Sequence, residues 1–276
     1  MRPFPVTVGS TIVTIFHLSH SYFLSGPLPC FILLFLTKSN LATFLSGKAV
    51  SKKEREERGI KDSTLVYGEV TFKALGTVLE KIKKVYGLPN VGSSGVEGFL
   101  QEGQRGVFYD LGSGTGKPVV AAAIAHTFDV CYGIEILEGL YSISLDVLNA
   151  YNTRGKAKLN RTTDTHVQMM LGNMLSFEVK DWRDGDVIFL NSTCYDENIM
   201  MTIAKMARGL KKGAFLISLT KQLPSDDFVV LEYEMYKMSW GDATIFLSQK
   251  ITDAKQDDDD EEGDDDDDDD DGDLEV

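Results

Sequence analysis

The sequence predicts an α/β protein whose sheet is mostly parallel and ends in an antiparallel hairpin. Three observations support this. Short apolar runs alternate with amphipathic segments over residues 107–250, as in a parallel sheet with crossover helices. A glycine-rich turn directly follows the first of these runs, and two long strand-like segments flank Gly241-Asp242, which is typical of a hairpin. The chain of 276 residues, 43% hydrophobic and 25% charged, is long enough to bury a sizeable core.

The expected elements follow in order along the chain. An amphipathic helix over 69–86 should cover the sheet, because apolar residues recur in it every three or four positions. Further helices are expected at 117–127, 137–151 and 199–210, and strands at 107–111, 130–135, 166–171, 187–191, 214–220, 229–240 and 243–249. Five parallel strands closed by a hairpin, seven in all, are typical of a Rossmann-like class I methyltransferase sheet rather than a dehydrogenase sheet.

The segments outside this domain divide the chain at about residues 64 and 252. Residues 1–64 comprise an apolar segment and a mixed-charge helix or linker over 48–61, residues 65–252 the α/β domain, and residues 253–276 an acidic tail. No residue between Arg2 and Lys38 is charged, so membrane anchoring by residues 10–37 is one interpretation. Polar residues and prolines interrupt that run, which favours a packed segment or a misassigned start of the coding sequence.

The net charge of −14 belongs to the end of the chain. Residues 257–276 hold 16 of the 42 acidic residues and none of the 28 basic ones, which leaves about +2 over residues 1–256. Such a tail cannot bury a core and should be disordered. It either binds a basic partner or acts as a solvating appendage.

Cysteine and histidine usage indicates no metal site. The three cysteines are far apart and odd in number, which excludes a disulfide framework and favours a reducing compartment. The four histidines show no metal-binding spacing. We therefore expect no metal cofactor.

The most informative motif is the turn Asp110-Leu-Gly-Ser-Gly-Thr-Gly-Lys117, between a strand and a helix. A phosphate-binding P-loop would need a glycine at Leu111 and Ser or Thr at Pro118, so that interpretation fails twice. A dinucleotide site would need GxGxxG, but the spacing is GxGxG with an acid before it. A tight turn without any ligand remains an alternative.

S-adenosylmethionine fits the turn better, because this ligand has no phosphate to neutralise. Asp110 can face its ammonium group, and Glu135, at the end of the next strand, can accept both ribose hydroxyls. The Asn173 amide oxygen can accept the adenine amino group. Asn191 follows the fourth strand and could orient an acceptor amine, although it could equally be a strand-end cap.

These motifs together resemble a known family. Val66-Tyr-Gly-Glu69, the glycine turn, Tyr132-Gly-Ile-Glu135, Val187-Ile-Phe-Leu-Asn191 and Ser239-Trp-Gly241 occur in that order. They resemble the catalytic domain of the disruptor-of-telomeric-silencing family, non-SET methyltransferases that act on a lysine in the core of histone H3. The resemblance covers about residues 65–250.

The resemblance implies roles for particular residues. Tyr67 and Glu69 would belong to a loop closing over the methionine end of S-adenosyl-L-methionine, and Asn191 would lie beside the transferring methyl group. The expected catalytic residues are Asn191 and Tyr67. The expected cofactor-binding residues are Tyr67, Glu69, Asp110, Gly112, Ser113, Gly114, Gly116, Glu135, Asn173, Met174 and Asn191.

The sequence departs from the family on the acceptor side. The family usually has Asn and Phe after the fourth-strand Asn, whereas Ser192 and Thr193 stand here. Aromatic residues could rebuild a channel for a methylated ammonium group. The expected substrate channel is Phe189, Thr193, Tyr195, Trp240 and Phe246.

The leading hypothesis is a nuclear lysine methyltransferase whose partner is histone H3 in the nucleosome. One alternative keeps the cofactor site but transfers to a non-histone lysine or a small amine, at a membrane if the N-terminal segment is an anchor. Another is an interaction protein that binds the cofactor without turnover and holds basic histones through its acidic tail.

Overall fold

The computed structural model describes residues 38–60, 65–86, 105–159 and 164–255, with side chains from Gly47 onward. The apolar segment 10–37, most of the glycine-rich stretch 88–106 and the acidic tail from 256 lie outside these ranges. Among the described residues, no helix has the length and hydropathy that crossing a membrane requires.

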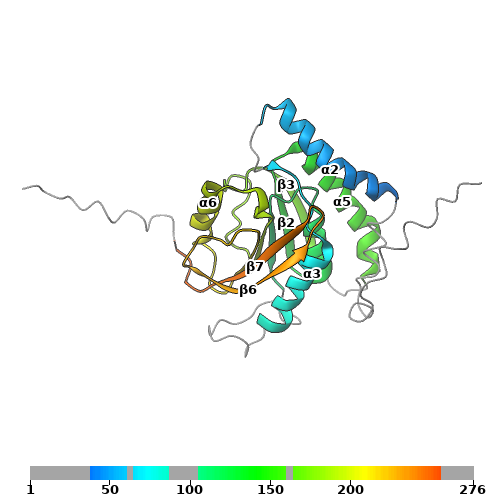
Figure 1. Cartoon of the computed structure of the whole chain (residues 1–276). Helices are drawn as coiled ribbons and strands as arrows, with labels where there is room; N and C mark the ends of the chain where they lie inside the picture. The colour runs from blue at the N-terminus through cyan, green and yellow to red at the C-terminus, as the bar shows by residue number, and fades with distance from the viewer. Residues whose placement is uncertain (1–37, 61–64, 87–104, 160–163, 256–276) are drawn as a thin grey trace, which may run out of the picture.

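A single seven-stranded sheet forms the centre of the structure, in the order β3-β2-β1-β4-β5-β7-β6 (Figure 1). Its strands are β1 Val107–Leu111, β2 Val130–Glu135, β3 His166–Leu171, β4 Val187–Leu190, β5 Phe215–Leu219, β6 Phe228–Lys237 and β7 Asp242–Lys250. The first five pair in parallel, and β7 runs antiparallel to both β5 and β6. The predicted sheet with its C-terminal hairpin is therefore confirmed.

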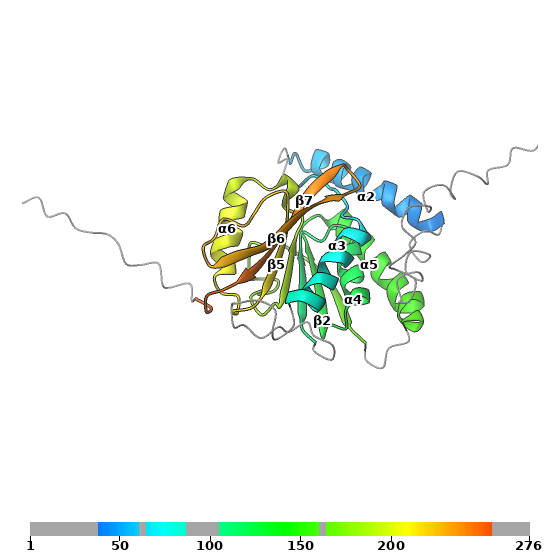
Figure 2. The ribbon, with the colours of Figure 1, turned by 60° about the horizontal axis from the view of Figure 1, so that its bottom comes forward.

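Helices cover both faces of this sheet (Figure 2). The helices are α2 Lys38–Glu57, α3 Phe72–Lys81, α4 Lys117–Ala125, α5 Glu138–Ala150 and α6 Glu197–Ala207. One apolar core lies between the sheet and α3, α4 and α5, and a second lies between the sheet and α6. The two cores hold the strands in place, so their carboxyl ends form a rigid edge.

The ends of the helices differ from the predicted bounds because polar side chains cap them. α3 begins at Phe72 rather than 69, since the Thr71 hydroxyl accepts a hydrogen bond from the Ala74 amide. α6 begins at Glu197 rather than 199, since Asp196 caps it in the same way. α3 then continues as a π-helical turn over Ile82–Tyr86, and the first strand of the hairpin ends at Lys237 rather than 240.

The mixed-charge segment before the domain is a helix, and it packs on α5. The Glu54 carboxylate accepts hydrogen bonds from the Glu138 and Gly139 amides, at 3.0 and 2.8 Å. A Cβ on Gly139 would lie 2.4 Å from Val50 Cγ1, so the two helices approach closely there. α2 therefore packs against α5, the helix that follows β2, and stabilises its first turn.

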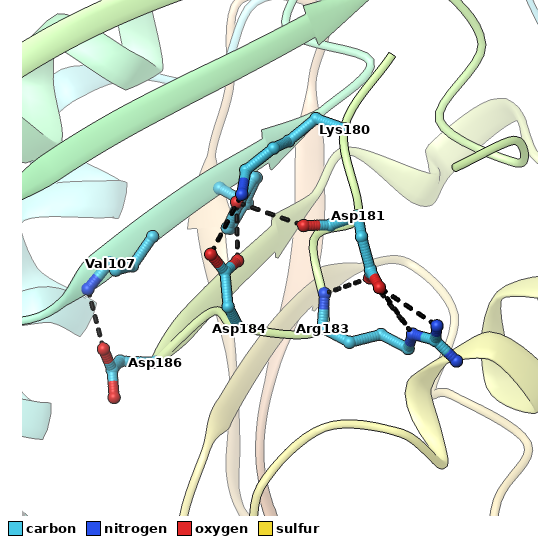
Figure 3. A network of polar contacts seen from close by, with 7 residues as sticks. Val107, Lys180, Asp181, Arg183, Asp184 and Asp186 are labelled. Atoms are coloured by element: carbon cyan, nitrogen blue, oxygen red, sulfur yellow. Dashed lines mark hydrogen bonds and ion pairs between the residues drawn. The ribbon is translucent and has the colours of Figure 1, made fainter. Parts of the chain in front are cut away.

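A polar network joins the loop between β3 and β4 to β1 of the sheet (Figure 3). Asp184 accepts a hydrogen bond from the Tyr109 hydroxyl at 2.6 Å and pairs with Lys180 at 3.0 Å. The Lys180 ammonium also lies 5.3 Å from the Tyr132 ring centroid. Trp182, fully buried, anchors the loop by donating to the Met174 carbonyl. This loop thereby presents Asn173 and Met174 at the carboxyl edge of the sheet.

Candidate cofactor and methyl-acceptor site

The glycine turn adopts a conformation that side chains would obstruct. Gly112, Gly114 and Gly116 all have positive φ, at 82°, 55° and 72°. A Cβ on Gly112 would lie 2.4 Å from the Tyr195 hydroxyl, and one on Gly114 would lie 2.6 Å from the Tyr67 ring. The turn therefore packs directly beneath two aromatic side chains.

A cavity of about 260 Å³ opens beside this turn, at the carboxyl ends of β1, β2 and β4. This is the place where open α/β sheets bind ligands. Most of the predicted site residues line it, namely Tyr67, Glu69, Asp110, Gly112, Ser113, Gly114, Glu135, Asn173, Met174, Phe189, Asn191 and Tyr195.

Four of the predicted site residues lie outside the wall of that cavity. Gly116 caps α4, and a Cβ there would meet the Met169 side chain. Thr193 donates a hydrogen bond to Asn191 Oδ1, and the Trp240 ring covers Gly68. Phe246 lies on β7 with its ring 5.8 Å from that of Tyr233, centroid to centroid. The wall thus includes two of the five predicted channel residues, Phe189 and Tyr195.

Asp110 is the most constrained acid in the cavity wall. The residue is 1% exposed, and its Oδ2 has no hydrogen-bond partner among the residues that the structure describes. Burial, with the charge of Glu135 as a further cause, raises the pKa of Asp110 well above its usual value. A buried acid of this kind favours a cationic ligand group beside it.

Glu135 closes the other side of the glycine turn. Its carboxylate accepts the Gly114 amide at 2.7 Å and the Leu137 amide at 2.8 Å. Burial raises its pKa, although hydrogen bonds from backbone amides act in the opposite direction. Each carboxylate oxygen keeps further acceptor capacity, which two neighbouring hydroxyls could use.

The loop 65–71 is held against the turn by Tyr67 and Glu69, which were predicted site residues, together with Thr115 and Lys117, which were not. The Tyr67 hydroxyl donates to Glu69 and lies 2.9 Å from the Thr115 hydroxyl. Glu69 also pairs with Lys117 at 2.7 Å, with both side chains largely buried. The sequence signal for this cluster was Lys117, because a lysine directly after the glycine turn must place its side chain near the turn.

Asn191 connects β4 to the same loop. Its Nδ2 donates to the Gly68 carbonyl at 2.9 Å, and its Oδ1 accepts the Thr193 hydroxyl at 3.1 Å. The Tyr195 hydroxyl donates to the Leu111 carbonyl and lies against Gly112 of the turn. The amide of Asn191 is therefore fixed in one orientation at the cavity wall.

Two motifs far apart in the sequence meet over this loop. A Cβ on Gly68 would lie 2.8 Å from the Trp240 ring. The Glu69 amide donates to the Ser239 hydroxyl at 3.2 Å, and the Ser239 amide donates to the Glu69 carbonyl at 3.3 Å. The turn after β6 therefore packs against the loop 65–71 at Gly68 and Glu69.

Asn173 is exposed at the far end of the cavity. Its Oδ1 accepts the Leu175 amide at 2.9 Å, which leaves one lone pair and the amide N–H groups for a ligand. Met174 follows it, with its sulfur 3.8 Å from the Tyr195 hydroxyl. Within the described ranges, no cluster of three or more His, Cys, Asp or Glu residues is suited to a metal ion.

The strand order, the hairpin and the cavity at the glycine turn define a class I methyltransferase fold. The sequence profile of the family described as "Histone methylation protein DOT1" matches residues 51–240. The chain belongs to this family, as the motifs in its sequence predicted.

Two curated relatives carry the same description, "Histone-lysine N-methyltransferase, H3 lysine-79 specific". The relative from Debaryomyces hansenii is 27% identical over 206 residues, which cover 70% of this chain and 16% of the relative. The relative from Eremothecium gossypii is 25% identical over 166 residues, which cover 59% of this chain and 25% of the relative. The chain thus matches only a quarter or less of the length of either relative.

Solved structures with a similar fold include two methyltransferases. An RNA methyltransferase from Salinibacter ruber, in complex with S-adenosyl-L-homocysteine, is 22% identical with a TM-score of 0.39, covering 55% of this chain and 87% of that one. A putative tRNA (m1A22) methyltransferase from Streptococcus pneumoniae, in complex with S-adenosyl-L-methionine, is 12% identical with a TM-score of 0.43, covering 66% and 73%.

Proposed function

We propose that this protein transfers a methyl group from S-adenosyl-L-methionine to a lysine in the core of histone H3. The observation that carries the proposal is the charge of the cavity wall. Asp110, Glu135 and Glu69 supply three carboxylates, and Lys117, paired with Glu69, is the one lysine or arginine among the described residues that line the cavity. Such a wall favours a ligand with positive charge at its sulfur and its amino group.

The residues of the wall suit the parts of this cofactor, which supplies an electrophilic methyl group on a sulfonium. Asp110 would bind the ammonium group, because its Oδ2 lacks a partner within the described part of the chain. Glu135 would hold the ribose hydroxyls, and Asn173 with Met174 would contact the adenine. The open turn at Gly112, Ser113 and Gly114 lets the backbone approach the ligand.

The chemistry on the acceptor side depends on position rather than on a protein base. Burial and the neighbouring Glu69 raise the pKa of the Tyr67 hydroxyl, so Tyr67 stays neutral and protonated. Asn191 does not titrate, and it would orient the acceptor nitrogen against the methyl group. The acceptor lysine therefore reaches the site already deprotonated, and the rate of transfer should rise with pH.

The choice of histone H3 rests on the family and on the names of the relatives, which specify lysine 79 of H3. A nuclear location follows from this choice of substrate. Ser192 and Thr193 make the acceptor side less aromatic than the family pattern. Phe189 and Tyr195, which line the cavity together with Tyr67, would contact the lysine stem.

Two measurements test the proposal in sequence. Calorimetric titration with S-adenosylhomocysteine should show binding to the wild type and its loss in Glu135→Ala, whereas Glu80→Ala, an exposed acid on α3, should bind normally. Radiolabel from S-adenosylmethionine should then appear on nucleosomal H3, with much less in Asn191→Ala and normal labelling in Asn149→Ala. Mass spectrometry of the labelled nucleosomes would identify the lysine.

Other outcomes would redirect the assignment. Binding of the cofactor product without labelling of free or nucleosomal histone would leave a methyltransferase for another lysine or a small amine. Fractionation of cells with an antibody against the C-terminal segment would then separate a nuclear enzyme from a membrane-associated one. Absence of binding would overturn the proposal.

A further inference from the structure

A threonine in a left-handed backbone conformation lies next to the site. Thr220, directly after β5, has φ of 66°, and it is the one non-glycine residue with positive φ in the described ranges. Side chains branched at Cβ rarely adopt this conformation, and such strain concentrates at functional positions. Its backbone is held there, because the Thr220 amide donates to the Thr244 carbonyl at 2.7 Å. Glycine would adopt this conformation without strain, so the presence of threonine points to a role for its side chain.

The Thr220 hydroxyl lies at the end of a directional chain of hydrogen bonds. It is 3.1 Å from the Thr193 hydroxyl, which donates to Asn191 Oδ1 at 3.1 Å. The direction is fixed at the other end, because the Gly68 carbonyl can only accept, so Nδ2 of Asn191 must face it. Thr193 has one proton and gives it to Asn191, which requires Thr220 to donate to Thr193.

From this chain we propose that Thr193 and Thr220 are positioning residues, which fix the plane of the Asn191 amide at the cavity wall. The inference rests on the proposed function, because it assigns to these hydroxyls the orientation of the residue that faces the acceptor. Hydrogen bonds in such a chain polarise one another, so Asn191 Oδ1 is held more firmly than by one isolated threonine. These contacts also explain the structural roles of Ser192 and Thr193, the two residues after Asn191 that differ from the family pattern. Ser192 bonds to the Leu219 carbonyl and amide and ties β4 to β5, and Thr193 begins the chain.

Substitution of Thr193 separates the hydrogen bond from the shape of the side chain. Thr193→Val keeps the shape and removes the hydroxyl, and we expect turnover to fall about tenfold because the amide can rotate. Binding of S-adenosylhomocysteine should change less than about threefold, since the Lys117–Glu69 pair and the hydrogen bond between Glu69 and Ser239 still hold the loop. Thr193→Ser should restore turnover, and Thr153→Val, at an exposed threonine beyond α5, should change nothing.

Substitution of Thr220 separates position from strain. Thr220→Gly relieves the backbone strain and removes the hydroxyl, so we expect a higher melting temperature together with lower turnover. Thr220→Ser should keep most of the turnover. A purely structural role would make the less strained variant at least as active as the wild type, and that result would overturn the inference.

Two further readouts keep this test separate from the proposed function. In an Asn191→Ala background, Thr193→Val should cause no additional loss, because the residue through which it acts is absent. The side-chain amide resonances of Asn191, identified by their absence in Asn191→Asp, should shift in Thr193→Val and Thr220→Gly without any substrate present. Unchanged resonances would contradict the chain of hydrogen bonds, whereas an inactive wild type with shifted resonances would contradict only the proposed function.

Discussion

Asp110 is a residue that suits a ligand but destabilises the unliganded protein. Its carboxyl group is buried at the end of β1, and no described residue makes a hydrogen bond to its Oδ2. Desolvation of a carboxylate costs free energy unless a partner compensates it. A cationic ligand would supply the missing partner, so stability and binding are coupled at this residue.

We expect Asp110→Asn to stabilise the unliganded protein by about 1 kcal/mol near neutral pH, measured by chemical denaturation. Because burial raises the folded-state pKa of Asp110, the stability of the wild type should fall as pH rises through that pKa. The variant should lack this fall. Asp146→Asn, at an exposed acid on α5, serves as the control and should follow the wild type.

The same carboxyl group predicts the pH dependence of binding. A ligand ammonium requires the ionised form of Asp110, so affinity for S-adenosylhomocysteine should increase with pH until the carboxyl is ionised before binding. Calorimetry in buffers of different ionisation enthalpy should detect protons released on binding at the lower pH. Asp110→Asn should bind at least about tenfold more weakly. If the wild type binds S-adenosylhomocysteine no more tightly than Asp110→Asn does, and its affinity does not change with pH, this role for Asp110 is excluded.

Gly68 is a second residue at which a small change should have a large effect. An added Cβ would lie 2.8 Å from the Trp240 ring, which covers the loop. We expect Gly68→Ala to weaken binding of S-adenosylhomocysteine about tenfold by displacing the loop, and a second change, Trp240→Leu, to recover part of it. Gly76→Ala is the control, since its Cβ would approach no nearer than 3.9 Å and alanine favours its helix.

At this scale the sequence placed the acids better than the aromatic residues. Asp110 and Glu135 each lie at the carboxyl end of a parallel strand, and neighbouring strands bring such ends together. Trp240 and Phe246 were expected in the channel from residue type alone, and they lie outside the cavity wall because their positions depend on the hairpin. Lys117 was missed because the turn was considered only as a ligand site.

At the scale of secondary structure, α2 stabilises the start of α5. The N-cap residue of α5 is Leu137, which makes no capping hydrogen bond. Glu54 replaces that cap from another helix, and its negative charge also favours the N-terminal end of α5. No pattern within residues 138–150 could reveal a cap located more than 80 residues earlier.

We expect Glu54→Ala to lower the free energy of unfolding by about 1 kcal/mol, measured by thermal or chemical denaturation. Glu56→Ala is the matched control, since Glu56 is exposed on the same helix and its carboxylate pairs with Lys52 at 3.7 Å. The control should cost a few tenths of a kcal/mol at most. Equal losses in the two variants would show that the cap contributes nothing.

The strands were predicted more accurately than the helix ends. Apolar runs bounded by glycine and polar residues fix strands to within a residue, as β2 and β3 show. Helix ends depend on capping side chains such as Thr71 and on turns that continue with a different hydrogen-bonding pattern, as at Ile82–Tyr86. Apolar periodicity does not report either feature.

At the scale of the whole molecule, segments far apart in the sequence meet at the loop 65–71. The glycine turn contacts this loop at Tyr67, and the turn after β6 contacts it at Gly68 and Glu69, with a hydrogen bond between residues 170 positions apart. The order of motifs in the sequence suggested a common site, but long-range contacts such as Glu69 with Ser239 follow only from the folded sheet. The turn after β6 therefore helps to hold the loop 65–71 that lines the site.

The distribution of charge separates the described domain from the end of the chain. Residues 1–256 carry about +2, whereas residues 257–276 carry 16 acids and no base. The described structure ends near a cluster in which Asp227 contacts Lys250 and Lys255, at 3.7 and 3.0 Å. These contacts fix the last described residues to the sheet, so a truncation after Lys255 leaves them in place.

We therefore expect truncation after Lys255 to leave the melting temperature and the binding of S-adenosylhomocysteine unchanged while weakening association with free histones. The attraction between exposed charges is screened by salt, with a Debye length of about 10 Å at 0.1 M. The difference between full-length and truncated protein should accordingly be large at low salt and small near 0.5 M. A control that replaces the acids of residues 257–275 with their amides should match the truncation, because length is then preserved and charge is not. Equal histone binding by all three proteins at low salt would show that the tail is a solvating appendage, and association of histones would then depend on the domain alone.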